Sequence, residues 1–374
     1  MTLGILKEHG SEQRVSITPD ALPALQKLGF DKILVERGAG AAAYFSDETY
    51  AAQGAQIADT AEVIRQSQVL AHIQPLSAAQ LQHFSPGQIL VGQFNPLSQP
   101  ENVNSWLTAG LTVFSLDLAP RSTRAQALDV LSSMATVAGY KAVLLAAASL
   151  PNFLPMFMTA AGTIKPAKIL VLGAGVAGLQ AIATAKRLGA IIEAFDVRTA
   201  AKEEVLSLGA KFVEVPGAAE SAAAGGYAVE QSEEYKQKQA ALVQQHAAQA
   251  DIVICTAQIP GRRAPILVTA DTVRNMKPGS VIVDLAASTG GNCELTENAT
   301  TKQVHGVTII GDSNLPSTMP KDASVLFSRN VVNFLKLIML KGELTLNFED
   351  DIVAATCAVH NGAVVSERVK NLRK

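Results

Sequence analysis

The stretch AKILVLGAGVAGLQAIATAKRLGAIIEAFDVR, residues 167 to 198, specifies how the middle of this chain folds. A short run rich in β-branched residues (168–172) leads into the glycine turn G-A-G-V-A-G (173–178), and an apolar pattern of helical period follows. A second apolar run (191–195) ends on Asp196. This order of strand, glycine turn, helix, strand and acid predicts a parallel βαβ unit that binds a dinucleotide.

The three glycines of this turn each have a physical role. Gly173 permits the tight turn, Gly175 lets the backbone approach a pyrophosphate, and Gly178 lets the helix pack closely on the strand. The free N–H groups and the dipole at the start of the helix favour the negative charge of the phosphates. We therefore expect the cofactor to lie along this turn.

The acid at the end of the second strand indicates which dinucleotide is bound. Asp196 follows the third glycine at close to the ~20 residues typical of the fingerprint, where a carboxylate accepts from a ribose 2′-hydroxyl and repels a 2′-phosphate. This favours NAD(H) over NADP(H). Arg198 points the other way, because a nearby arginine can accommodate a 2′-phosphate.

Composition sets the class of the protein. The 374 residues are 48% hydrophobic and 17% charged, which is typical of a globular chain of two or three domains. A net charge of -2 gives no reason to expect nucleic acid as a partner. The three distant cysteines suggest reduced thiols in a cytosolic protein, and the six histidines form no cluster of metal ligands, so no metal is expected.

One uncharged stretch tests the prediction of a chain without a membrane span. No charged residue lies between Lys141 and Lys165, a length that could cross a bilayer, and the N-terminus carries no signal peptide. Pro151, Asn152 and Pro155 interrupt this stretch and would leave backbone groups unsatisfied in lipid. We expect a buried helix followed by an apolar loop.

Apolar periodicity predicts α/β structure on both sides of the quoted stretch. Strands are expected at 3–5, 32–35, 69–73, 88–91, 111–116, 211–215, 251–255, 280–285, 307–310 and 352–355, and helices at 19–28, 47–55 behind a Ser46 cap, 124–150 and 322–340. The expected fold is two doubly wound, Rossmann-like lobes joined by the two long helices, with a cleft between them. The N-terminal lobe spans 1–130 and is completed by 323–374, and the NAD(H)-binding domain spans 131–322.

Two further segments could carry function. The connection from Val215 to Asp251 is small, polar and rich in glycine, and is either a plain surface loop or a lid that carries Tyr227. The predicted helix at 124–150 opens with P-R-S-T-R-A-Q-A-L-D-V-L-S-S, and its Asp129 and Ser132 share a helix face. Taken alone, an ordinary solvated first turn explains that pattern equally well.

This opening segment resembles the NAD(H)-binding alpha subunit of proton-translocating NAD(P) transhydrogenases. The resemblance extends over M-T-A-A-G-T, the glycine turn and its helix, the G-G-Y loop, K-P-G-S-V-I-V-D-L-A and G-G-N-C, and so covers nearly the whole chain. It implies a homodimer that binds NAD(H) and docks on a separate NADP(H)-binding subunit attached to a membrane proton-channel subunit. It also implies direct hydride transfer between two nicotinamides, in a cytoplasmic component held peripherally on an inner-membrane complex.

The resemblance also assigns site residues. The residues that hold the nicotinamide and its ribose fall on Arg121, Gln126, Asp129 and Ser132, with Gln126 facing the NADP side. Tyr227 falls on the mobile-loop tyrosine that closes over the nucleotide. The remaining cofactor contacts are assigned to Gly173, Ala174, Gly175, Val176, Gly178, Asp196, Val197, Arg198, Gly226, Thr256 and Ala257.

Two alternatives remain. Alanine dehydrogenases share the two-lobe plan and the pattern K-E-x(5)-R-V, here Lys7 to Val15. Their substrate lysine, acid/base histidine and aspartate are replaced by Gln74, the stretch G-Q-F-N (92–95) and Ser288, so Arg14 is expected to form a structural salt bridge. The other alternative is an NAD-binding module without turnover of its own.

Overall fold

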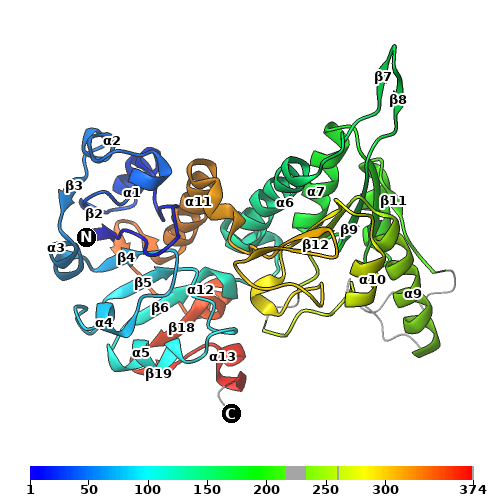
Figure 1. Cartoon of the computed structure of the whole chain (residues 1–374). Helices are drawn as coiled ribbons and strands as arrows, with labels where there is room; N and C mark the ends of the chain where they lie inside the picture. The colour runs from blue at the N-terminus through cyan, green and yellow to red at the C-terminus, as the bar shows by residue number, and fades with distance from the viewer. Residues whose placement is uncertain (216–232, 259–260, 373–374) are drawn as a thin grey trace. The chain divides into compact units, whose positions relative to one another are not determined.

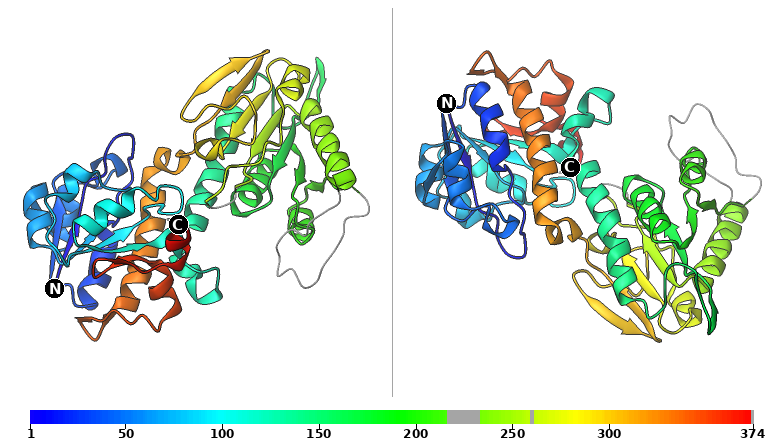
Figure 2. Two further views of the ribbon diagram at one scale, coloured as in Figure 1. Left: turned by 90° about the horizontal axis from the view of Figure 1, so that it is seen from below. Right: turned by 90° about the horizontal axis from the view of Figure 1, so that it is seen from above.

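The computed structural model describes residues 1–215, 233–258 and 261–372, so the predicted lid residues Gly226 and Tyr227 lie outside the described residues. The chain forms two compact units. Unit 1 comprises Met1–Met134 and Pro316–Lys374, and unit 2 comprises Ala135–Leu315. The N-terminal and C-terminal segments, blue and red in Figure 2, thus belong to the same unit.

Unit 1 is built on an eight-stranded sheet with the order β19-β18-β6-β5-β4-β1-β2-β3. The strands are β1 (Thr2–Ile5), β2 (Lys32–Glu36), β3 (Gln56–Ala58), β4 (Val69–Ala71), β5 (Ile89–Gly92), β6 (Thr112–Ser115), β18 (Cys357–His360) and β19 (Ala363–Val364). Strands β1 to β6 are parallel, and β18 joins β6 in the antiparallel direction. The order turns at β1, which confirms a doubly wound lobe. Strand β3 is one that the periodicity did not indicate.

Local capping explains where several helices of unit 1 begin. The helices are α1 (Leu22–Lys27), α2 (Asp47–Ala52), α3 (Thr60–Gln66), α4 (Ala78–Leu81), α5 (Asn102–Thr108), α11 (Pro320–Ile338), α12 (Asp351–Thr356) and α13 (Glu367–Leu372). The predicted Ser46 cap is confirmed, since its side chain accepts from the Thr49 N–H. The strand predicted at 352–355 is wrong. Asp350 accepts from the N–H groups of Ile352 and Val353 and thereby starts helix α12 instead.

Unit 2 is built on a seven-stranded sheet with the order β11-β10-β9-β12-β13-β15-β14. The strands are β9 (Lys168–Leu172), β10 (Ile191–Phe195), β11 (Lys211–Phe212), β12 (Ile252–Cys255), β13 (Val281–Asp284), β14 (Thr301–Val304) and β15 (Val307–Ile310). All six predicted strands are present and parallel, and β14 adds an antiparallel edge that the sequence patterns did not indicate. The order turns between β9 and β12, where doubly wound sheets bind ligands.

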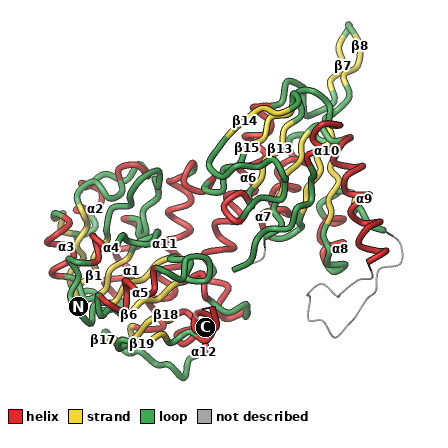
Figure 3. Tube along the Cα trace, turned by 60° about the horizontal axis from the view of Figure 1, so that its bottom comes forward, coloured by secondary structure: helices red, strands yellow, loops and turns green. Residues whose placement is uncertain are grey.

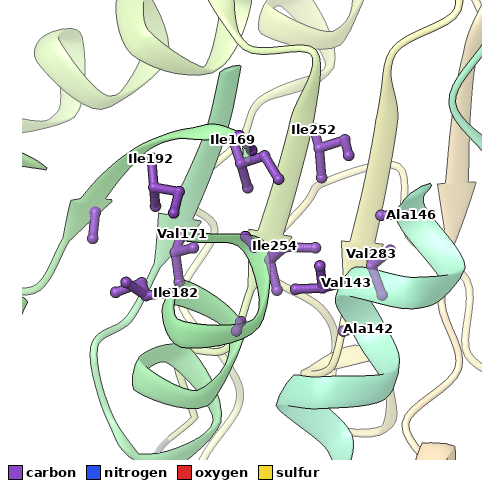
Figure 4. Close-up of a cluster of buried hydrophobic side chains, with 14 of the residues drawn as sticks. Ala142, Val143, Ala146, Ile169, Val171, Ile182, Ile192, Ile252, Ile254 and Val283 are labelled. Carbon is purple, nitrogen blue, oxygen red and sulfur yellow. The ribbon is translucent and has the colours of Figure 1, made fainter. Parts of the chain in front are cut away.

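Small residues allow the helices of unit 2 to approach its sheet closely. The helices are α6 (Val130–Ser149, continuing from unit 1), α7 (Val176–Arg187), α8 (Ala201–Ser207), α9 (Glu233–Gln249) and α10 (Ala270–Asn275). Ala142, Val143 and Ala146 of α6 face the isoleucines and valines of the central strands (Figure 4). A Cβ on Gly139 would lie 2.1 Å from the carbonyl oxygen of Ala177, so only glycine permits this contact of α6 with α7.

The predicted helix at 124–150 is interrupted near its start. Residues Thr123–Leu128 form a short 3-10 helix, and Asp129 adopts an extended conformation with ψ 92° before α6 begins at Val130. Asp129 Oδ1 accepts from the Ser132 N–H at 2.9 Å, so the carboxylate caps the helix instead of lying on its face. A short polar side chain that competes for backbone hydrogen bonds is the physical reason for the break.

The apolar loop predicted after this helix is instead an exposed β-hairpin. Strands β7 (Phe157–Thr159) and β8 (Gly162–Ile164) extend from the rest of unit 2 (Figures 1 and 3), and every residue of both strands is exposed. In the part of the chain that the structure describes, α6 alone is long and apolar enough to cross a membrane by length and composition. One face of α6 packs into the core of unit 2.

Candidate functional site

The glycine turn of unit 2 has the geometry of a phosphate cradle. Gly173 has φ +100°, which disfavours any residue with a side chain. A Cβ on Gly178 would lie 1.9 Å from the carbonyl oxygen of Gly173, whereas a Cβ on Gly175 would meet nothing within 4 Å. Gly175 is the N-cap of α7, and a glycine offers no side chain to the N–H groups of Val176, Ala177 and Gly178. This open space beside unused donors fits the pyrophosphate of a dinucleotide.

Asp196 joins the turn to the end of β10. Its Oδ2 accepts from the Ala174 N–H at 2.8 Å, and its side chain is 7% exposed. Arg198 forms a two-point ion pair with it, Nε to Oδ1 at 3.0 Å and a terminal nitrogen to Oδ2 at 3.0 Å. These hydrogen bonds raise the pKa of Arg198. The arginine is thus neutralised by the acid next to it, which weakens the signal for a 2′-phosphate, and Val197 between them is exposed.

The loop after β12 lies directly against the turn. Thr256 donates from its hydroxyl to the carbonyl oxygen of Gly173 at 2.9 Å, and its N–H donates to Leu172 at 2.8 Å. The N–H of Ala257 donates to the side chain of Asn292 at 3.0 Å. Neither Asn292 nor the buried Asp284 behind it was predicted as a site residue. An acid at the end of a buried apolar strand, before G-G-N-C, was the available signal.

The other predicted site residues lie in unit 1, around the start of α6. Asp129 accepts from both the N–H and the hydroxyl of Ser132, the latter at 2.5 Å, and both residues are partly buried. Arg121 and Gln126 are exposed. Unit 1 therefore brings Asp129 and Ser132 into contact and presents Arg121 and Gln126 to solvent.

The segment that carries Gln126 is anchored on both sides. Arg124 pairs with Asp350 at 2.6 Å and with Asp351. The carbonyl oxygen of Ala127 accepts from the side-chain amides of Asn330 and Asn333 on α11, each at 2.9 Å. These contacts hold the backbone of a short 3-10 helix and leave the amide of Gln126 available to a ligand.

Comparison with known proteins places the chain. Two family models match it, "Alanine dehydrogenase/PNT, N-terminal domain" over residues 4–138 and "Alanine dehydrogenase/PNT, C-terminal domain" over residues 142–367. An NAD(P) transhydrogenase alpha subunit of Rhodospirillum rubrum is 44% identical, with 98% of each chain covered. The crystal structure of transhydrogenase from Sinorhizobium meliloti has 44% identity and a TM-score of 0.90 over 98% of this chain and 100% of that one. The chain belongs to the alanine dehydrogenase/PNT family, among its NAD(P) transhydrogenase alpha subunits.

Alanine dehydrogenases are more distant members of the same family. That of Bacillus subtilis is 28% identical over 99% of this chain and 94% of its own. The transhydrogenase resemblance and the α/β fold with parallel sheets are thus confirmed, and the family implies NAD(H) binding and an oxidoreductase-related role. The name "subunit alpha" implies further subunits.

The position of the dehydrogenase substrate residues holds a closed polar cluster. Arg14 makes the predicted salt bridge, with two hydrogen bonds to Glu12 at 2.7 and 2.6 Å, and the Gln74 amide donates to the same carboxylate at 3.1 Å. Glu12 and Arg14 are each 6% exposed. Since the charge of Arg14 is already matched, the cluster is not prepared to bind a substrate carboxylate.

Glu8 and His72 lie behind this cluster as a second buried pair. Glu8 accepts from the Ile73 N–H at 2.6 Å, and Nε2 of His72 lies 3.3 Å from Glu8 Oε2. Burial raises the pKa of Glu8 to about 8 and lowers the pKa of His72. The carboxyl group therefore holds a proton at neutral pH.

This pair predicts a pH-dependent stability for unit 1. Because the pKa of Glu8 in the folded state lies above its usual value of 4.5, its stabilising contribution is complete below that value and is lost as the pH rises through about 8. We expect wild type to lose stability relative to Glu8→Gln between pH 6.5 and 9, at no more than about 1.4 kcal/mol per pH unit. Urea unfolding at several pH values measures this difference. Glu101→Gln, at an exposed position, serves as control, and a difference independent of pH would contradict the prediction.

The described residues contain three free cysteines and no group of metal-ligating side chains. Cys255, Cys293 and Cys357 are all buried. Burial raises the pKa of each thiol. The thiols are therefore packing groups with little thiolate character.

Proposed function

We propose that this chain is the NAD(H)-binding component of a proton-translocating transhydrogenase. Its activity is hydride transfer from NADH to NADP⁺ held on a partner subunit. The observation that carries the proposal is the glycine turn with open space at Gly175 beside Asp196, in a chain that is 44% identical to a transhydrogenase alpha subunit.

The residues of the chain serve to bind and orient. Gly173, Gly175, Gly178 and the start of α7 hold the pyrophosphate, and Asp196 accepts from a ribose hydroxyl. The nicotinamide supplies and accepts hydride when bound. Arg121, Asp129 and Ser132 orient the nicotinamide carboxamide and its ribose, and Gln126 faces the ring on the partner subunit. No proton moves at carbon in such a transfer, so positioning alone suffices and no general acid or base is required.

The proposal includes the assembly. The chain forms a homodimer on the cytoplasmic face of the inner membrane and docks on an NADP(H)-binding subunit, which a membrane proton-channel subunit couples to proton translocation. The exposed hairpin supports the homodimer, because Phe157 and Met158 are 41% and 75% exposed and an isolated two-stranded hairpin is marginally stable in water.

A stopped-flow assay tests the reaction. Hydride transfer from NADH to an NADP⁺ analogue is measured with and without the purified NADP(H)-binding subunit of a related transhydrogenase. Fast transfer only in the mixture is the expected result. Reduction of NAD⁺ by this chain alone with L-alanine would instead support an alanine dehydrogenase activity, and NADH binding without any transfer in the mixture would support a module without turnover.

Replacing Asp196 by alanine tests the basis of cofactor choice. We expect the preference for NADH over NADPH to fall by at least about tenfold, because a charge-assisted hydrogen bond to ribose is lost and Arg198 is released from its ion pair. Titration of both nucleotides by fluorescence gives the ratio. Arg198→Ala is the matched variant and is expected to retain the preference. An unchanged preference in Asp196→Ala would assign the discrimination to other residues.

A further inference from the structure

Asn292 of unit 2 joins the nucleotide-binding loop after β12 to two other loops. Its Nδ2 donates to the carbonyl oxygens of Ala257 at 2.9 Å and of Pro265 at 2.8 Å, and its Oδ1 accepts from the Ala257 N–H at 3.0 Å. Asn292 is fully buried. Because both backbone polar groups of Ala257 are engaged, an amide turned by 180° would oppose like groups at every contact, so one orientation alone satisfies the site.

Asp284, at the end of β13, holds Asn292 in place. Its Oδ2 accepts from the N–H groups of Asn292 and Cys293 at 2.8 and 2.9 Å and from the Thr296 hydroxyl at 2.7 Å. Asp284 is fully buried, and its Oδ1 accepts from the Ala286 N–H at 3.0 Å. A buried carboxylate with four donors is satisfied and rigid, so it is a firm support for the amide beside it.

The clamped loop presses on the glycine turn. Thr256, next to Ala257, donates to the carbonyl oxygen of Gly173 at 2.9 Å. A Cβ on Gly173 would lie 2.6 Å from the Thr256 hydroxyl and 3.1 Å from the Ala257 nitrogen. Because no free space separates these groups, a displacement of Ala257 is passed on to the turn.

We propose that Asn292 is a positioning residue of the nucleotide site, which clamps both backbone groups of Ala257 and so holds the loop after β12 against the glycine turn in the geometry that binds NAD(H). The inference rests on the function proposed above, in that NAD(H) is the ligand of this turn. Asn292 acts through Ala257 and is not itself a ligand contact.

The amide can be replaced by a group whose fit depends on pH. A carboxylate at position 292 would face the carbonyl oxygens of Ala257 and Pro265 and would lie beside the carboxylate of Asp284. The neighbouring thiols of Cys255 and Cys293 carry raised pKa values through burial and supply no compensating positive charge. A protonated carboxyl group, by contrast, again donates to one carbonyl and accepts from Ala257.

The experiment measures the Kd for NADH by fluorescence titration of the full chain at pH 6.0, 7.0 and 8.5, together with thermal unfolding. We expect Asn292→Ala to raise the Kd at least about tenfold. Thr296→Ala removes a hydrogen bond to the same Asp284 but leaves the clamp intact, and is expected to change the Kd less than about threefold. Asn292→Asp should bind NADH nearly as wild type does at pH 6.0 and about tenfold more weakly, relative to wild type, at pH 8.5.

Two results would overturn the inference. One is an Asn292→Ala protein that unfolds at a lower temperature but binds NADH as Thr296→Ala does, which would make the residue structural only. The other is an Asn292→Asp affinity, relative to wild type, that does not change with pH. Failure of wild type to bind NADH would contradict the proposed function instead, so the two failures are distinguishable.

Discussion

Gly175→Ala is expected to weaken NADH binding by about 100-fold while unit 2 stays folded. The added methyl group meets no atom of the protein within 4 Å, so the folded chain accommodates it, at a cost of no more than about 1 kcal/mol for a poorer N-cap. The same methyl group occupies the space proposed for the pyrophosphate and blocks its approach to the first N–H groups of α7. NADH titration and urea unfolding of the same protein measure the two effects.

Gly178→Ala is the matched control for this prediction. Its Cβ would lie 1.9 Å from a backbone carbonyl, which cannot move without opening the contact between α7 and β9. We expect Gly178→Ala to lose both stability and NADH binding. Tight NADH binding by Gly175→Ala would show that the ligand does not lie along the turn.

Gln126→Asn is expected to slow hydride transfer by roughly 10- to 100-fold while the Kd for NADH changes less than about threefold. The side chain is exposed on a segment that Arg124 and Ala127 anchor, so the shorter amide leaves the backbone in place. It withdraws the amide group by one methylene from the ring that it is proposed to face. Single-turnover transfer in the mixture with the NADP(H)-binding subunit gives the rate, and titration gives the Kd.

Gln82→Asn controls for the chemical change, since Gln82 is also exposed in unit 1 but lies on the C-cap of α4. It is expected to transfer hydride as wild type does. The role proposed for Gln126 fails if Gln126→Asn weakens NADH binding strongly and keeps the wild-type rate once NADH is bound.

Local sequence was sufficient to predict the nucleotide-binding unit. The turn at 173–178 and the acid at 196 act through backbone conformation and local spacing, which are written in consecutive residues, and β9, α7 and β10 lie where these patterns predicted. The family was equally accessible, because its motifs are short contiguous segments and the relatives share 44% identity with this chain.

Long-range packing and competing hydrogen bonds set the features that apolar periodicity could not register. Helix α6 begins only after Asp129 because that carboxylate caps it, and the run at 352–355 is helical because Asp350 competes for its backbone. The link from Asp284 through Asn292 to Ala257 joins three loops by side-chain hydrogen bonds. The pairing of Asp196 with Arg198 reverses the meaning of an arginine that a motif treats as free. The link between the three loops exists only once the sheet has brought its strand ends together, so tertiary structure alone could reveal it.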